Sequence, residues 1–137
     1  MSARTKARKR ALDVLYGSEL RGLPLDGLLD GALDGAAAPR DYTRFLVRGV
    51  VEHQPRLDAA LEQHSVGWSL ARMPAVDRNL LRIGCFEVLL VDDVPNEVAI
   101  SEAVHLAGEL STDESPAFVN GLLARIAELK PSPTRDR

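Results

Sequence analysis

Residue types that carry redox, metal or cofactor chemistry are scarce in this chain of 137 residues. Cys85 is the single cysteine, so no internal disulfide can form, and the three histidines are too scattered for a local zinc pattern. Neither a Walker loop nor a Gly-x-Gly-x-x-Gly loop is present. The sequence therefore predicts no metal site, no cofactor and no catalytic residue.

Long apolar runs are also missing. No segment is long enough to span a membrane, and no apolar block of signal-peptide type follows the positively charged start. The lone Cys85 lies in the most apolar segment, where we expect it to be inert core. These features favour a cytoplasmic protein.

Aromatic residues make up only 4% of the chain, whereas hydrophobic residues make up 45%. The core must therefore be built mainly from Leu, Val, Ile and Ala, which favours helices over a β-sandwich or barrel. The length fits one ordinary domain.

Apolar side chains recur at helical spacing along most of the chain, which predicts helices and no strands. The expected segments are 4–20, 25–35, 41–54, a short helix after Pro55, one turn within 68–72, 75–91, 95–110 and 115–129. Because Pro55 has no backbone donor, it should break or kink the third helix near Gln54. The residues of that helix expected to face inward are Tyr42, Phe45, Leu46 and Val50.

Residues 75–91 are apolar almost all round, which is typical of a buried central helix. We predict an all-α fold of six to seven helices in two packed bundles that share this segment. The N-terminal helical half is 1–63, the C-terminal half is 64–130, and 131–137 form a flexible tail. Glu87 lies on the buried side of the central helix and is interpreted as a structurally satisfied acid.

Asn120-Gly121 is a dipeptide typical of hairpin turns, but its flanks have the period of a helix. We therefore place it inside the last helix, at a cost of roughly 1 kcal/mol for the glycine. A glycine at that position suggests that another group approaches the backbone closely.

Charge is distributed very unevenly. The net charge is −3, yet residues 1–10 hold five basic side chains and no acid: Arg4, Lys6, Arg8, Lys9 and Arg10. Without those five of the 17 basic residues, 12 basic side chains face 20 acidic ones, a net charge of −8 for residues 11–137. The first helix can thus offer a local cationic site on a body that repels polyanions.

The basic cluster suits phosphate binding, because one helical end projects several cations at once. At helical spacing Lys6, Lys9 and Arg10 fan outward, whereas Arg4 and Arg8 must reach past the end of the bundle. Five contacts to single-stranded RNA would give a slope of log K against log salt of about −3.5. The alternative is a solvated, frayed terminus.

Four stretches, in order, resemble the NusB family of bacterial transcription antitermination factors, in its actinobacterial form: ARTKARKRALDVLY (3–16), PAVDRNLLRIGCFEVL (74–89), DVPNEVAISEAVHLA (93–107) and STDESPAFVNGLL (111–123). The resemblance covers nearly the whole chain. It implies two three-helix bundles and no enzymatic activity. It also implies binding to single-stranded boxA RNA of ribosomal RNA leaders, jointly with the ribosomal small-subunit protein NusE, within the RNA polymerase antitermination complex.

The resemblance also implies roles for residues outside the basic cluster. Glu114 and Phe118 match positions near RNA, and His64 stands where the family can offer a stacking Tyr. Tyr16, Asp77 and Arg82 match the NusE-facing surface. The structural alternatives remain open: Phe118 as core, Glu114 as a helix-dipole partner, His64 as an ordinary surface residue, and Asp77 and Arg82 as internally paired groups.

Two other functions are compatible with these features. The chain could be the RNA-binding appendage of an rRNA methyltransferase system, since NusB-like domains occur fused to such enzymes. It could also bind membrane surfaces through its basic helix, which liposome sedimentation would reveal, although that helix has little bulky apolar surface near its cations. The oligomeric state is either a monomer or a homodimer through the Tyr16 region.

Overall fold

The computed structural model describes residues 2–25, 28 and 40–129. All regular structure in this part of the chain is helical, which confirms the all-α prediction. The elements are α1 (Ala3–Arg21), α3 (Arg40–His64), the short 3-10 helix η1 (Leu70–Arg72), α4 (Ala75–Leu90), α5 (Asn96–Leu110) and α6 (Ser115–Leu129). Most of the predicted helix at 25–35, and the predicted tail at 131–137, lie outside the described residues.

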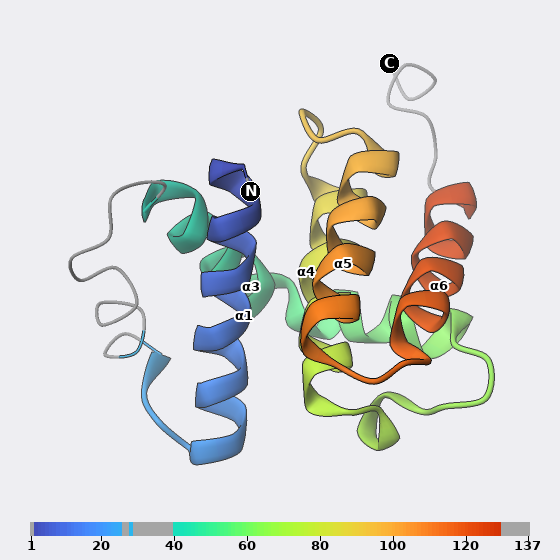
Figure 1. Cartoon of the computed structure of the whole chain (residues 1–137), viewed down its shortest axis with the longest axis horizontal. Helices are drawn as coiled ribbons and strands as arrows, with labels where there is room; N and C mark the ends of the chain where they lie inside the picture. Colours follow the sequence, from blue (N-terminus) through green and yellow to red (C-terminus); the bar gives the residue numbers. More distant parts are fainter. Residues whose placement is uncertain (1, 26–27, 29–39, 130–137) are drawn as a thin grey trace.

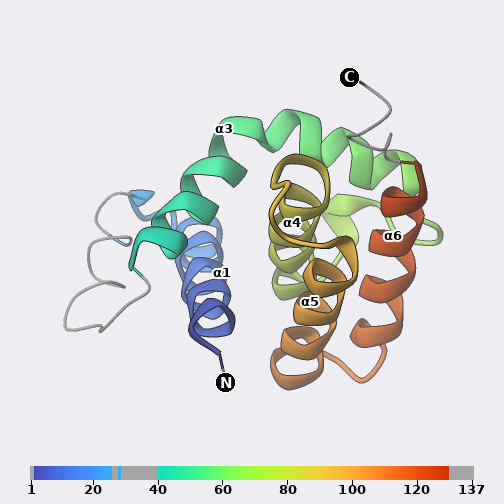
Figure 2. The same cartoon turned by 90° about the horizontal axis from the view of Figure 1, so that it is seen from above.

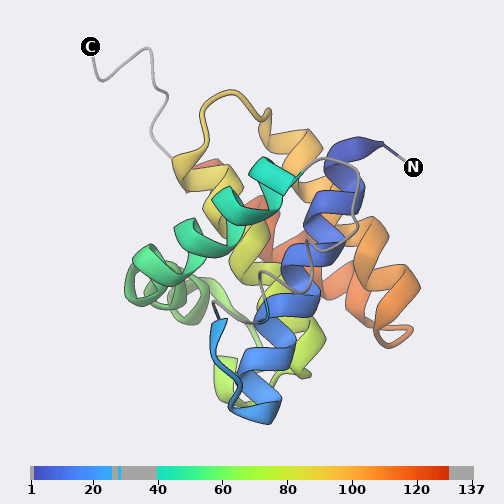
Figure 3. The same cartoon turned by 90° about the vertical axis from the view of Figure 1, so that its left-hand side faces the viewer.

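Helix α4 lies at the centre of the fold, as its sequence predicts. It contacts α1 and α3 on one side and α5 and α6 on the other (Figures 1 and 2). Every residue from Asn79 to Val88 is buried, because helices surround α4 on all sides. Figure 3 shows α1 and α3 inclined to one another in front of α4. No helix among the described residues is long and apolar enough to cross a membrane.

Of the break or kink predicted at Pro55, the break is wrong, because α3 continues through this residue to His64. Proline in a helix interior costs roughly 3 kcal/mol. Here the ring lies on the exposed side, and Leu57 and Leu61 beyond it are both fully buried, which offsets that cost. Figure 2 shows α3 curving across the top of the other helices. The proline is therefore accommodated in a curved helix, and no separate short helix follows it.

The inward orientation predicted for Phe45 is also wrong, since 46% of this residue is exposed. The reason is Gly49, one turn further along α3. A Cβ atom there would lie 2.1 Å from Cζ of Phe86, so the Phe86 ring occupies the space that a side chain would need. Phe45 lies at the edge of the core, with its ring centroid 5.4 Å from that of Phe86. Leu46 and Val50 are buried as predicted.

Candidate nucleic-acid interface

The outward side of α1 carries a basic face, defined here as Lys6, Lys9 and Arg10. Lys6 is exposed, and Lys9 and Arg10 are partly exposed, whereas the residues on the opposite side of the helix are buried. This confirms the predicted fan of cations. A capped first turn holds the face in place, because the backbone N–H of Thr5 donates to Oγ of Ser2 at 3.1 Å.

Arg10 has an unusual environment. Its Nη1 is the one buried side-chain nitrogen or oxygen without a hydrogen-bond partner in the part of the chain that the structure describes. Buried polar atoms in native proteins are nearly always bonded. This nitrogen is shielded from solvent, so the accessible positive charge of the basic face is carried by Lys6, Lys9 and the partly exposed remainder of Arg10.

Arg4 also reaches solvent, at the N-terminal end of α1. Its guanidinium lies 4.2 Å from the ring centroid of Tyr42, and its Nη2 lies 3.6 Å from an oxygen of Asp93. Asp93 is itself exposed, so this ion pair is weak and can exchange for another anion. Arg4 is therefore accessible to solvent while its guanidinium packs against Tyr42 and Asp93.

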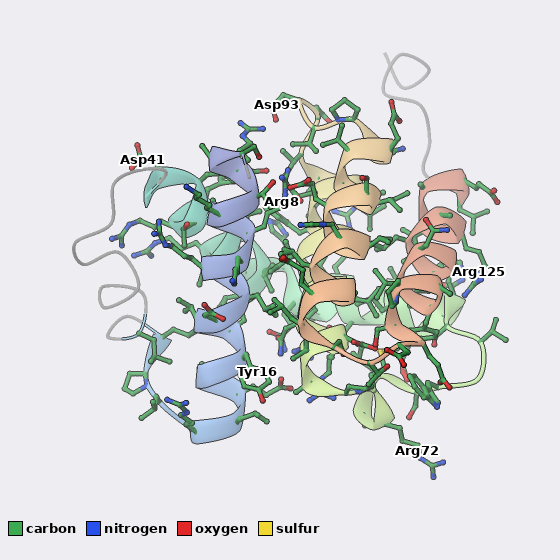
Figure 4. All side chains as sticks on the ribbon, viewed as in Figure 1. Arg8, Tyr16, Asp41, Arg72, Asp93 and Arg125 are labelled. Atoms are coloured by element: carbon green, nitrogen blue, oxygen red, sulfur yellow. The ribbon has the colours of Figure 1, made fainter. Side chains whose placement is uncertain are left out.

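Arg8 does not reach past the bundle, and the position predicted for it is wrong. Only 3% of the residue is exposed, and it points between α1 and α4 (Figure 4). Its Nε and Nη2 donate to the two carboxylate oxygens of Glu87 at 2.8 and 2.9 Å. Its Nη1 donates to Glu102 at 2.9 Å. All three donor groups are thus engaged inside the protein, and Glu87 is the internally satisfied acid that the sequence predicts.

Hydrogen bonds extend this buried ion pair across four helices. The hydroxyl of Tyr42, on α3, donates to Glu87, and the hydroxyl of Thr5 donates to Glu102. Burial alone would lower the pKa of Arg8, but the hydrogen bonds and charge of Glu87 outweigh it and raise that pKa. Burial, followed by the hydrogen bond to Glu87, raises the pKa of Tyr42 well above its usual value. Arg8 therefore stays charged and fixes α1 against α4 and α5.

Asp77 is internally paired, which is the structural alternative left open by the sequence. It is fully buried in the first turn of α4. Its two oxygens accept hydrogen bonds from Oγ of Ser111 at 2.5 Å and from Oγ of Ser115 at 2.8 Å. Asp77 thus holds the loop between α5 and α6, which carries Glu114, against α4. It presents no surface to a partner.

Arg82 is also largely buried and internally paired. Its Nε and Nη2 donate to the two carboxylate oxygens of Asp58 at 2.8 and 3.0 Å, so the pair joins α3 to α4. Two hollows, of about 500 and 220 Å³, share Arg82 and Glu19 in their walls. Tyr16, half-buried on α1, lies one helical turn before Glu19. Arg82 and Glu19 are therefore reached by solvent through these two hollows, and they do not form a flat cationic surface.

The remaining predicted RNA residues gather along α6. Glu114 is exposed just before the helix, and Phe118 is half-buried on its first turn. His64 ends α3, and its carbonyl oxygen accepts a hydrogen bond at 3.0 Å from Nε of Arg125. Gly121 lies within the helix, as predicted. The atom nearest to a Cβ built there is Nη1 of Arg125, at 3.4 Å, so the expected close approach is made by a flexible side chain of the same helix.

Trp68 belongs with these residues, although sequence reasoning did not assign it. Its ring packs edge-on against Phe118, with centroids 5.2 Å apart. The available signal was that this is the sole tryptophan of the chain, in an irregular segment between two helical ones. We call Trp68, Phe118 and Arg125 the α6 surface.

The basic face and the α6 surface are separate. Helices α4 and α5 stand between α1 and α6, and in Figure 4 Arg8 and Arg125 lie on opposite sides of them. The structure therefore does not bring the two sets of residues together in one compact site.

Cys85 is fully buried in α4. Burial, followed by the negative charge of Asp58, raises the pKa of its thiol to about 12. We expect the folded protein to resist a thiol-specific reagent at pH 8 and to react fully in denaturant, since the thiolate is the nucleophile. The absorbance of the released reagent measures the rate of labelling, and rapid labelling of the folded protein would contradict this expectation.

Comparison with known proteins agrees with the helical arrangement. A model of the NusB family matches residues 5–128. The chain is 59% identical to the transcription antitermination protein NusB of a Nocardioides species, over 96% of this chain and 98% of that protein. It is 62% identical to the protein of the same name from Kineococcus radiotolerans, over 95% and 96%.

Solved structures show the same fold. T. maritima NusB superposes with a TM-score of 0.89 at 32% identity, over 98% of this chain and 97% of that one. A NusB chain in a complex of the antitermination factors NusB and NusE with double-stranded RNA gives a TM-score of 0.84 at 28% identity, over 93% and 98%. With matches of this extent in both sequence and structure, the chain belongs to the NusB family.

Proposed function

We propose that this chain is a non-enzymatic antitermination factor. It binds boxA RNA of ribosomal RNA leader transcripts together with NusE, and so supports processive transcription by RNA polymerase. The observation that carries the proposal is the solvent-exposed basic face of α1, on a chain whose remainder is acidic. Relatives named as antitermination proteins support the biological setting.

The cations supply attraction and positioning more than sequence reading. Phosphate contacts carry no base information, so discrimination between RNA sequences needs other groups. The α6 surface and Glu114 provide an aromatic pair and a carboxylate suited to bases rather than to phosphates. We assign attraction to the basic face with Arg4, and discrimination to Glu114, Phe118 and, with a smaller role, His64.

The protein partner belongs near Tyr16 and the hollows bounded by Arg82. Tyr16 is half-buried, and the hollow of about 500 Å³ offers a concave surface between α1, η1 and α4. A partner such as NusE can insert side chains there, whereas Asp77 acts only by holding the neighbouring loop. A homodimer through this region would compete with the partner. Adding NusE should therefore shift the molar mass measured by light scattering from that of the homodimer to that of a heterodimer with NusE.

The burial of Arg8 changes the expected salt dependence of RNA binding. Four exposed or partly exposed cations of α1 remain, namely Arg4, Lys6, Lys9 and Arg10, so α1 should contribute about −2.8 to the slope of log K against log salt rather than −3.5. The triple variant Lys6→Ala, Lys9→Ala, Arg10→Ala should reduce this slope by about 2. Fluorescence anisotropy of labelled RNA between low and moderate salt measures both values. An unchanged slope in the triple variant would remove the basic face from the RNA site.

The central test is a gel shift on boxA RNA and on a scrambled sequence, each with and without NusE. We expect binding of both RNAs by the chain alone at low salt, and a clear preference for boxA when NusE is present. Equal affinity for the two RNAs in the presence of NusE would overturn the specific function.

A further inference from the structure

We propose that Trp68 stacks on an unpaired base of single-stranded RNA, with Phe118 supporting its ring and Arg125 contacting the phosphate backbone. This inference rests on the proposed function and extends it, because it adds Trp68 and Arg125 to the RNA site and assigns the bases and the phosphate backbone to different ends of the α6 surface.

The two rings form a platform that stays partly open to solvent. Trp68 and Phe118 are each half-buried, with an interplanar angle of 60° between their rings. The Trp68 position is constrained, since Oγ of Ser65 donates to its carbonyl oxygen at 2.5 Å and η1 begins two residues later. A partly exposed and rigid aromatic ring loses little entropy when a base stacks on it. The indole N–H has no hydrogen-bond partner in the described part of the chain, so it is free to meet RNA.

Arg125 places a cation on the side of α6 that carries Phe118. It lies seven residues after Phe118, two turns along the same side of the helix and about 10.5 Å in rise. Nε is fixed by the carbonyl oxygen of His64, while neither terminal nitrogen has a hydrogen-bond partner among the described residues. The absence of a side chain at Gly121 lets Nη1 lie back over the helix toward Phe118. The guanidinium is therefore held in place with free donors.

The two ends of the line from Glu114 to Arg125 along α6 carry opposite charges. Exposed Glu114 lies one turn before Phe118, and the free guanidinium lies at the other end. A carboxylate repels phosphate and accepts base N–H groups, whereas a guanidinium binds phosphate. Bases should therefore meet the Glu114 and Trp68 end, and the backbone should pass Arg125. This arrangement of charges favours a single RNA strand over an apolar protein segment as the occupant.

Trp68 is the sole tryptophan, so its emission reports on this surface alone. The experiment titrates the full chain with an end-labelled single-stranded RNA of about 12 nucleotides, within typical site sizes. Anisotropy of the label and emission of Trp68 are recorded together. We expect emission to fall with the same midpoint as the rise in anisotropy. The same RNA annealed to its complement should bind without quenching, because paired bases cannot stack on the ring.

The outcomes separate the two claims. No anisotropy change at low salt would overturn the proposed function. A rise in anisotropy with constant Trp68 emission would overturn this inference and leave RNA binding intact. Quenching by NusE in the absence of RNA, with none by RNA, would identify a protein contact and also overturn it.

Variants test the same point independently. Trp68→Leu should weaken single-strand binding roughly 5- to 100-fold, whereas Trp68→Phe keeps a ring and should stay within about threefold. Val66→Ala, at a residue of the same segment that is 72% exposed, is the matched control and should change nothing. Arg125→Gln should reduce the salt slope by about 0.7, and Arg125→Lys should not. If Trp68→Leu lowers the melting temperature strongly, the quenching of the unmodified chain decides the question.

Discussion

Arg8→Ala is expected to destabilise the fold by about 3–5 kcal/mol, because it leaves the carboxylate of Glu87 buried without its cation. Glu87 is 1% exposed and cannot turn to solvent without opening the packing between α1 and α4. Urea unfolding followed by circular dichroism measures the loss. In a domain of this size, such a loss removes a large part of the total stability.

The matched control is Lys6→Ala, an exposed cation on the same helix, which should change stability by less than about 0.5 kcal/mol. The double variant Arg8→Met, Glu87→Leu removes both charges and should recover most of the loss, since a buried ion pair can be replaced by apolar groups at little cost. Equal urea midpoints for Arg8→Ala and Lys6→Ala would show that the pair does not hold the fold.

This prediction separates two explanations for any loss of RNA binding in an Arg8 variant. A phosphate contact would weaken binding in molecules that remain folded. A buried anchor would instead lower the folded fraction and leave the affinity of folded molecules nearly unchanged. Anisotropy titration at a temperature well below the unfolding midpoint distinguishes them, and we expect the second result.

Asp77→Ala is expected to cost about 2 kcal/mol, because Ser111 and Ser115 lose a charged acceptor inside the protein. The loop between α5 and α6 loses its attachment to α4. Hydrogen exchange of the amides at 111–115 should therefore accelerate more than exchange in the middle of α4. Asp92→Ala, at an exposed acid in the turn after α4, is the control and should leave both measurements unchanged.

Asp77→Asn separates a positioning role from a partner contact. The amide keeps an acceptor oxygen for one serine, so we expect partial recovery of stability and normal binding of NusE. A surface carboxylate paired with a partner cation would instead lose binding on neutralisation, with little change in stability. Loss of NusE binding by a fully stable Asp77→Asn protein would contradict the buried role assigned here.

The sequence by itself determined the features that depend on neighbours along one helix. The period of apolar residues located α1, α4, α5 and α6 to within a few residues, and the same period placed Lys6, Lys9 and Arg10 outward. It failed at Pro55 and Phe45, where the decisive factors were the burial of Leu57 and Leu61 and the approach of Phe86 to Gly49. Rules that consider only neighbours along the sequence include neither of these tertiary contacts.

Only the tertiary structure decided which polar groups are free. Arg8 meets Glu87 across 79 residues of chain, Asp77 meets Ser111 across 34, and Trp68, in the loop between α3 and η1, meets Phe118 on α6. Helical spacing gives the direction of a side chain from its own axis, but not the group that faces it from the next helix. Whether a charged residue binds RNA or locks two helices together depends on that facing group, because a buried charge must find its partner inside the protein.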